Sequence, residues 1–352
     1  MGSVRSRARE FLTSLAVSAM MALLLLAVSE GVLRLFAPQA PRTEPLSGGS
    51  RAVPDSLLGH RYRPGSRAVH RTPEFTAHYD IGPDGLRPTG NPPPDSAAVR
   101  ILTIGDSFTF GDCNDAIDAW VSVLERTLRE AGTPAAVING GVEGYDTRSE
   151  LLYLRELAPG ARPDVVVLGF LANDVYTNRP LADAPALSAT DAHSARPVLH
   201  TVELAKRMLM QNDRMYARLF LLTARKNYYA TVPSAKVLRQ TEITQTLLGE
   251  MSDYCQARGM RFVVVSIPQQ FAMLAVADGF DFPGIDPAII ESRLSPAVRA
   301  SGALWIDTLP ALVDDYRAHR VDLYYRMDGH LTPRGNRVVG TCVADALLHS
   351  NG

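Results

Sequence analysis

Two segments of this 352-residue chain place hydroxyl, carboxylate and imidazole groups directly after apolar runs. Ser107 lies in GDSFTFG, and Asp328 and His330 lie together in MDGHLTP near the end of the chain. A histidine can take the proton of a serine hydroxyl, while a carboxylate orients the imidazole and stabilises its cationic form. The residue types therefore suit acyl transfer from an ester, with Ser107, Asp328 and His330 as the predicted catalytic triad.

Two further segments supply groups that can stabilise the oxyanion of a tetrahedral intermediate. Gly144 lies in NGGVEGY, where glycines permit positive φ and a close approach of the backbone to a ligand. Asn173 lies in LAND and offers a side-chain amide that does not titrate. Together with the backbone amide of Ser107 at a strand-to-helix turn, Gly144 and Asn173 form the predicted oxyanion hole.

Each motif by itself also has a purely structural interpretation. Gly-Asp-Ser, Asn-Asp and Asp-Gly are all common in turns, so the prediction depends on their ordered occurrence after successive apolar runs. Asp174 and Asp307 are alternative acids, and Asp328 is preferred because its loop also supplies the histidine. The Gly-x-Ser-x-Gly elbow of α/β-hydrolases and the phosphate-binding loop motif do not occur in the sequence.

Five apolar runs of strand length alternate with longer amphipathic stretches after residue 98, which is typical of β-α units around a parallel sheet. Strands that are buried on both faces are predominantly apolar, as these runs are. We predict an α/β fold with three α/β/α layers and a mostly parallel five-stranded sheet. Ligand sites in such sheets lie beyond the carboxyl ends of the strands, where the predicted site residues stand. The predicted strands are 100–105, 135–139, 164–170, 261–267 and 303–306.

The ordered motifs resemble those of the SGNH, or GDSL-type, hydrolase family, which has blocks of the form G-D-S, a glycine, G-x-N-D and D-x-x-H. The resemblance covers roughly residues 99–348. It implies a flavodoxin-like SGNH hydrolase fold, with Ser107 as nucleophile and oxyanion donor. It also implies Gly144 and Asn173 as the other oxyanion donors, and Asp328 with His330 as the acid-base pair.

Two features depart from the family pattern. Ala172 precedes Asn173 without the usual nearby glycine, and Asp328 lies two rather than three residues before His330. The second spacing resembles that of alginate-acetylation relatives in the superfamily. The leading hypothesis is a serine esterase that removes small O-acyl groups from extracytoplasmic glycans or other acyl esters. The alternatives are an O-acyltransferase with the same triad and a catalytically silent envelope protein that binds a glycan or a partner.

The N-terminal part of the sequence indicates a single transmembrane helix. Residues 11–29 carry no charge and, as a helix, span most of a hydrocarbon core about 30 Å thick. Arg5, Arg7 and Arg9 precede this run and predict a cytoplasmic N-terminus, which places the catalytic part outside, in the periplasm or at the cell surface. A cleaved signal peptide is the alternative, although the apolar run is longer than a typical signal core.

The sequence divides into three predicted regions. Residues 1–36 form the cytoplasmic flank and anchor, 37–98 a Pro/Arg-rich stalk and lead-in with a short strand within 75–87, and 99–350 the hydrolase domain. A helical insertion or lid at about 176–235 interrupts the third β-α unit. Its apolar residues either line an acyl pocket or pack on the core. These residues are Met208, Met210, Met215, Tyr216 and Phe220.

The composition argues against several other classes of function. There are 36 basic and 37 acidic residues, so no global positive field is available to bind nucleic acid. Cys113, Cys255 and Cys342 have no metal-ligand spacing, allow at most one internal disulfide, and are predicted to be buried thiols. We predict neither a metal nor a cofactor. The expected partners are the membrane and an acyl-ester or O-acylated glycan substrate.

Overall fold

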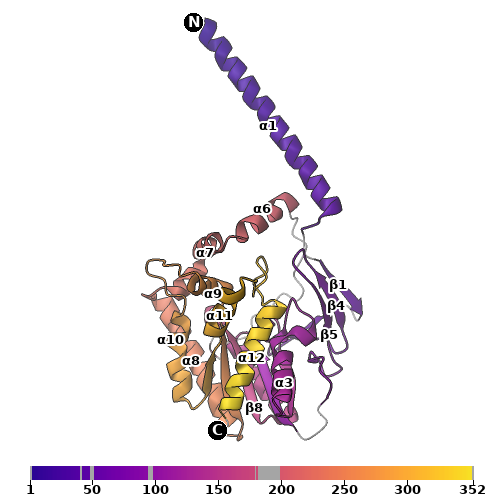
Figure 1. The fold of residues 1–352 in the computed structure, drawn as a ribbon, viewed down its shortest axis with the longest axis vertical. Coiled ribbons are helices and arrows are strands. Elements are labelled where there is room, and N and C mark those ends of the chain that lie inside the picture. The colour runs from indigo at the N-terminus through magenta and orange to yellow at the C-terminus, as the bar shows by residue number, and fades with distance from the viewer. Residues whose placement is uncertain are drawn as a thin grey trace.

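A long N-terminal helix projects from a body that is built around a five-stranded sheet (Figure 1). The computed structural model describes residues 2–39, 42–47, 51–93, 98–178, 180 and 199–350. Helix α1 comprises Gly2–Phe36, and its segment Glu10–Phe36 is the one helical stretch in these ranges that is long and apolar enough to cross a membrane. The predicted apolar N-terminal helix is therefore present. Its length and composition fit a membrane anchor and also a signal sequence.

The central sheet is parallel throughout and has the strand order β10-β9-β8-β6-β7. This order and direction confirm the predicted α/β class and the five strands. Every residue of the central strand β8 is buried, because helices cover both faces of the sheet. The strands are β6 Val99–Gly105, β7 Ala135–Gly141, β8 Val165–Leu171, β9 Arg261–Ile267 and β10 Leu304–Asp307.

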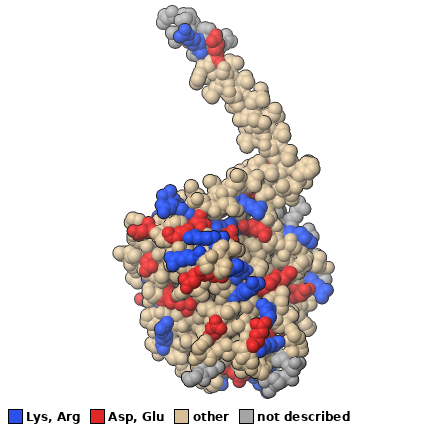
Figure 2. Space-filling view, viewed as in Figure 1, with Lys and Arg blue, Asp and Glu red and all other residues tan. Residues whose placement is uncertain are grey.

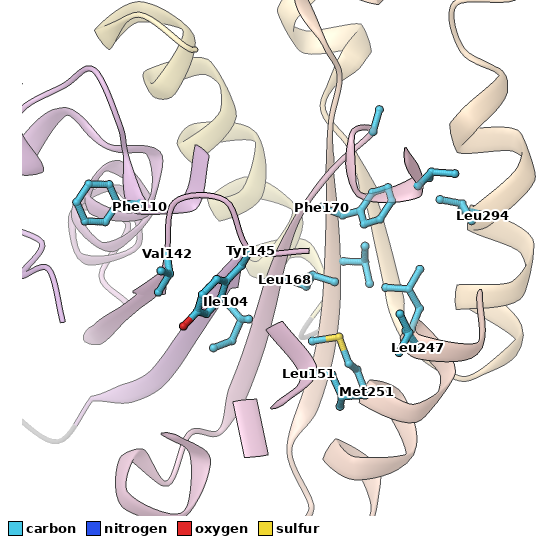
Figure 3. Packing of buried hydrophobic residues seen from close by; sticks show 14 of the residues in the cluster. Ile104, Phe110, Val142, Tyr145, Leu151, Leu168, Phe170, Leu247, Met251 and Leu294 are labelled. Carbon is cyan, nitrogen blue, oxygen red and sulfur yellow. The ribbon is translucent and has the colours of Figure 1, made fainter. Parts of the chain in front are cut away.

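Alternate residues of the strands point to two separate hydrophobic clusters, one on each face of the sheet. Leu168 and Phe170 of β8 face α4, α8 and α10, where Leu247, Met251 and Leu294 pack against them (Figure 3). The opposite face packs on α3, α9, α11 and α12. The helices of the two layers are α3 Trp120–Glu130, α4 Thr147–Ala161, α8 Ala235–Gln256, α9 Gln270–Ala277, α10 Ile289–Ala300, α11 Leu309–His319 and α12 Pro333–His349.

The region between the N-terminal helix and the sheet differs from the predicted stalk, because it folds against the body (Figure 1). Strands β1, β4 and β5 form an antiparallel sheet, and β2 pairs with β3 in a hairpin. Burial alternates along β5, where Ala77 and Tyr79 enter the core. Alternation over so few residues is a weak sequence signal beside many prolines and arginines. The strands are β1 Arg42–Ser47, β2 Ala52–Asp55, β3 Gly59–Tyr62, β4 Arg67–Arg71 and β5 Thr76–Asp80.

Two helices of the predicted insertion lie at the end of the body from which α1 projects (Figure 1). They are α6 His200–Met210 and α7 Asp213–Leu221, and a 3₁₀ turn, Ala224–Tyr229, follows them. The predicted helical stretch is thus present, divided into two helices by an Asn212 cap that accepts from the Met215 amide. Residues 179 and 181–198 of the insertion lie outside the described residues.

Candidate active site

Ser107 begins the short helix α2, Ser107–Phe110, directly after β6. Asp106 caps this helix by accepting a hydrogen bond from the Phe108 amide at 2.9 Å. A Cβ at Gly105 would lie 2.0 Å from Thr109 Oγ1, so only glycine allows the strand to turn this tightly. A Cβ at Gly141 would lie 2.2 Å from the Phe110 amide nitrogen, so the end of β7 also packs on the backbone of α2. The glycines of these motifs therefore fix the position of the serine.

The structure brings His330 to Ser107 across a separation of 223 residues. His330 Nε2 lies 2.7 Å from Ser107 Oγ, and His330 Nδ1 lies 2.5 Å from Asp328 Oδ1. Thr332 caps α12 by accepting from the Gly335 amide, with Pro333 in the first turn. The three residues of the predicted triad are thus contiguous in space.

The ring of His330 is held by an aromatic contact and by the chain around it. The Phe108 ring centroid lies 4.8 Å from that of His330. The backbone carbonyl of His330 accepts a hydrogen bond from the Tyr325 amide at 2.8 Å. The imidazole is therefore positioned by a ring contact and a fixed backbone as well as by its two hydrogen bonds.

Carboxylates around His330 stabilise its charged form. Burial disfavours the imidazolium, but the hydrogen bond that it donates to Asp328 and the negative charges of Asp112, Asp328 and Asp106 outweigh this effect and raise the pKa of His330 to about 9. Burial also opposes ionisation of Asp328, yet the hydrogen bond and charge of His330 lower the pKa of Asp328 to about 2. The pair thus favours an ionised carboxylate beside a readily protonated imidazole.

Cys113 contacts the carboxylate of Asp328. The sequence predicted a buried thiol at this position but not this contact. Its Sγ donates to Asp328 Oδ1 at 3.1 Å and lies 3.6 Å from His330 Nδ1. Burial raises the pKa of the Cys113 thiol well above its ordinary value, so the group remains a neutral donor. All three cysteines are free in the structure, and Cys113 and Cys255 are buried.

Asp112, Cys113 and His330 have ligand atoms within 4.8 Å of one another, which is the geometry of a possible metal site. Both imidazole nitrogens already make hydrogen bonds, to Asp328 and Ser107. The thiolate that a metal requires is disfavoured by burial. We therefore interpret Asp112 and Cys113 as residues that support His330 and not as metal ligands.

The segment that was predicted to be a stalk also supports the site. Glu74 accepts hydrogen bonds from the backbone amides of Met327 at 3.1 Å and Asp328 at 3.2 Å. Arg87 is 2% exposed and donates to the carbonyls of Phe110 and Gly111 at the end of α2. No motif marks either residue in the sequence, since their partners lie on distant parts of the chain.

A cavity of about 400 Å³ lies over Ser107. Asn173 lines it, whereas Gly144, with φ of 79°, lies in the loop after β7 and is not among the lining residues. Of the five apolar residues singled out in the insertion, the three on the cavity wall are Met210, Tyr216 and Phe220. Met208 is 69% exposed and Met215 faces a separate groove beside Phe280. Further lining residues include Phe108, Leu171, Leu219, Arg225, Gln269 and Arg326.

The alternative acids lie elsewhere. The Asp174 carboxylate accepts from Thr147 Oγ1 at 3.3 Å, and Asp307 accepts from the Leu309 amide at 2.9 Å. Within the described residues, the carboxylate hydrogen-bonded to the imidazole of His330 is that of Asp328.

Sequence comparison relates the region that carries the site to one described family. Residues 103–338 match the sequence profile of the GDSL-like Lipase/Acylhydrolase family. An arylesterase of Vibrio mimicus is 35% identical over 78 residues, which are 22% of this chain and 39% of that protein. Esterase TesA of Pseudomonas aeruginosa is 28% identical over 101 residues, 29% of this chain and 50% of that protein. The matches therefore span half or less of these curated relatives.

Solved structures of similar proteins include TesA and LAE5. The crystal structure of TesA has a TM-score of 0.41 and 15% identity, and it covers 70% of this chain and 97% of that one. LAE5, an alpha/beta hydrolase enzyme from the metagenome of Lake Arreo, Spain, has a TM-score of 0.44 and 16% identity, with coverage of 72% and 95%. Because the family profile matches residues 103–338, which are more than half of the sequence, the chain belongs to the GDSL-like lipase/acylhydrolase family.

Proposed function

We propose that the protein is a serine esterase that cleaves carboxylic ester bonds with Ser107, His330 and Asp328 as its catalytic triad. The observation that carries the proposal is the imidazole of His330, which contacts Ser107 Oγ at 2.7 Å and Asp328 Oδ1 at 2.5 Å. The first distance lies within the range expected for a nucleophile and its general base, and the second is a short hydrogen bond to the group that orients the base. The family assignment supports the same chemistry.

In the proposed reaction, Ser107 Oγ attacks the ester carbonyl carbon while His330 Nε2 takes the hydroxyl proton. The resulting oxyanion is stabilised by the backbone amide of Ser107 and by the side-chain amide of Asn173, the two predicted donors that line the cavity. Collapse of the intermediate breaks the bond to the alcohol, which leaves with the proton held by His330. Water, deprotonated by the same histidine, then hydrolyses the acyl-enzyme and releases the acid.

We place this activity outside the cytoplasm, with α1 as a membrane anchor. The arginines at positions 5, 7 and 9 precede the apolar run and favour a cytoplasmic N-terminus. The proposed substrates are small O-acyl groups on extracytoplasmic glycans, or other acyl esters that fit a cavity of about 400 Å³. The apolar side chains of Met210, Tyr216 and Phe220 suit the acyl part of such an ester.

The test is hydrolysis of aryl esters from acetyl to octanoyl by the full-length chain in detergent. Turnover that prefers one chain length would support the esterase and measure the acyl site. Absence of turnover on every ester would contradict it and favour a silent binding protein.

A second candidate, an extracytoplasmic O-acyltransferase with the same triad, is favoured by one observation. The two-residue spacing from Asp328 to His330 resembles that of alginate-acetylation relatives, and it allows the 2.5 Å contact. A transferase would release the aryl alcohol faster when a glycan acceptor is added and would acylate that glycan. Unchanged rates and an unmodified glycan would exclude transfer to that acceptor.

Replacement of the proposed oxyanion donor Asn173 by alanine is expected to lower kcat by roughly two to three orders of magnitude with little change in KM, because the amide acts mainly in the transition state. Steady-state kinetics on the preferred aryl ester measure this effect. Asn91→Ala is the matched control, since Asn91 donates to the Ser122 carbonyl in a region remote from the cavity. Equal kinetics in the two variants would show that the donor is another group.

Glu74 is expected to position the Asp328 loop. Glu74→Ala should lower kcat by about tenfold, because two loop amides lose their acceptor. Glu74→Gln keeps a carbonyl acceptor and should restore most of the activity. Kinetics of both variants, with thermal unfolding as a check on the fold, test this role. If Glu74→Gln and Glu74→Ala lower kcat equally, the charge of the Glu74 carboxylate and not its hydrogen bonds supports catalysis.

A further inference from the structure

The first residues of α6 are hydrogen-bonded to Glu30 in the C-terminal part of α1. The carboxylate of Glu30 accepts hydrogen bonds from the amides of His200 at 3.0 Å and Thr201 at 2.9 Å, and from Thr201 Oγ1 at 3.0 Å. The Gln39 amide donates to His200 Nδ1 at 2.7 Å, so the chain that leaves α1 holds the same turn. A carboxylate at a helix N-terminus satisfies free amides and complements the helix dipole. The start of α6 therefore stays beside Glu30.

The position of Glu30 also determines the depth at which α6 lies relative to a membrane. The uncharged run ends at Ser29, and its nineteen residues as a helix span about 28 Å, close to the thickness of a hydrocarbon core. Glu30 is the first charged residue beyond that run, so it belongs at the boundary with the headgroups. Since α6 begins there and runs crosswise to α1 along the end of the body, its length follows the membrane surface (Figure 1).

The outward side of α6 is apolar although nothing in the described structure covers it. Val202, Ala205 and Leu209 are exposed and follow the helical spacing of three and four residues. We call these three residues the outer stripe. Helix α7 is anchored to the body, because Ala217 and Phe220 are buried in the core. Leu222, directly after α7, is 81% exposed.

Basic residues flank the outer stripe. Between residues 199 and 229 the chain has six basic and two acidic side chains. Figure 2 shows a largely uncharged surface where α1 meets the body, with both basic and acidic side chains near its margin. An apolar stripe with lysines and arginines beside it is the pattern of a helix that lies in the interface of an anionic membrane. Of the six basic residues, Arg225 lines the cavity over Ser107 and Arg207 donates to the Pro73 carbonyl. The basic residues available to headgroups are the other four, which are exposed: Lys206, Arg214, Arg218 and Lys226.

We propose that α6 and α7 form an interfacial element that lies on the outer leaflet of the bilayer spanned by α1, with the outer stripe among the acyl chains and the basic residues at anionic headgroups. This inference rests on the membrane location given under Proposed function. Met210, Tyr216 and Phe220 of the same two helices line the cavity over Ser107. Docking of the stripe therefore holds the cavity next to the lipid surface, instead of leaving the body free to move on its tether.

The test uses the full chain in vesicles of phosphatidylcholine and phosphatidylglycerol that carry a spin label at the headgroup end of the acyl chains. Leu209→Trp adds one indole to the outer stripe, and the native Trp120 and Trp305 give the baseline. We expect a blue shift and about a twofold loss of the added emission, because an interfacial helix buries its apolar face below the headgroups. Val202→Trp probes the same stripe independently if Leu209→Trp alters the far-ultraviolet circular dichroism.

His349→Trp is the control, since His349 is exposed at the end of α12, at the opposite end of the body from α1 (Figure 1). Quenching of both stripe probes that is no greater than that of His349→Trp would overturn the docking. Equal quenching in vesicles of phosphatidylcholine alone would overturn the role of the anionic headgroups. A chain that fails to float with the vesicles would contradict the anchor itself. This experiment does not measure ester hydrolysis, so its result is independent of whether the esterase proposal fails.

Discussion

Ser107→Ala is expected to lower kcat on the preferred aryl ester by roughly 10⁴- to 10⁶-fold, while unfolding temperature and substrate affinity change little. The substitution removes the oxygen that attacks the ester but keeps the backbone amide that is proposed to donate to the oxyanion. The lost hydroxyl lines a polar cavity and contacts His330 Nε2 at 2.7 Å. Steady-state kinetics and trapping of the acyl-enzyme by mass spectrometry measure the effect.

Ser252→Ala is the matched control for Ser107→Ala. Ser252 lies on α8, is also buried and does not line the cavity. Its hydroxyl donates to the Ser301 carbonyl at 2.9 Å. This variant should lose a little stability and none of the turnover, because only a structural hydrogen bond is removed. If Ser107→Ala keeps native turnover, the nucleophile is a different residue.

His330→Ala is expected to reduce kcat/KM by roughly 10⁴- to 10⁶-fold and to remove a pH dependence that the native protein shows. A general base acts only when it is neutral, and the pKa of His330 is raised to about 9. Native kcat/KM should therefore rise about tenfold per pH unit below this pKa and level off above it. The measurement is the pH-rate profile of the native chain and of the variant.

Two further variants separate the base from its surroundings. Asp328→Asn removes the negative charge of Asp328 and leaves a neutral acceptor, so the pKa of His330 falls and the inflection should move to lower pH. His319→Ala is the control, because His319 is exposed on α11 and its ring contacts the Asp315 side chain and carbonyl. An inflection near pH 9 that persists in His330→Ala would assign the titration to another group.

The sequence predicted the sheet and the triad because both depend on local patterns. A strand that is covered on both faces must be apolar along its whole length, and β8 is buried throughout, so its boundaries could be predicted to within a residue. The topology of a parallel sheet brings the carboxyl ends of its strands to one edge. Ser107 and Asn173 follow two of these strands and both line the cavity, while Gly144, equally well placed in the sequence, does not.

The tertiary structure alone decided which other groups support the site. Cys113 and Glu74 reach the Asp328 loop from 215 and 254 residues away. Tyr79 is buried because it packs beneath Arg51 and against Phe110, although its segment reads as a proline-rich stalk. Such contacts depend on how whole elements pack against each other, and neither local propensity nor hydrophobic period carries that information. Local patterns therefore determined the strands of the central sheet and indicated the proposed triad, whereas non-local packing determined the residues that hold Asp328 and His330 in place.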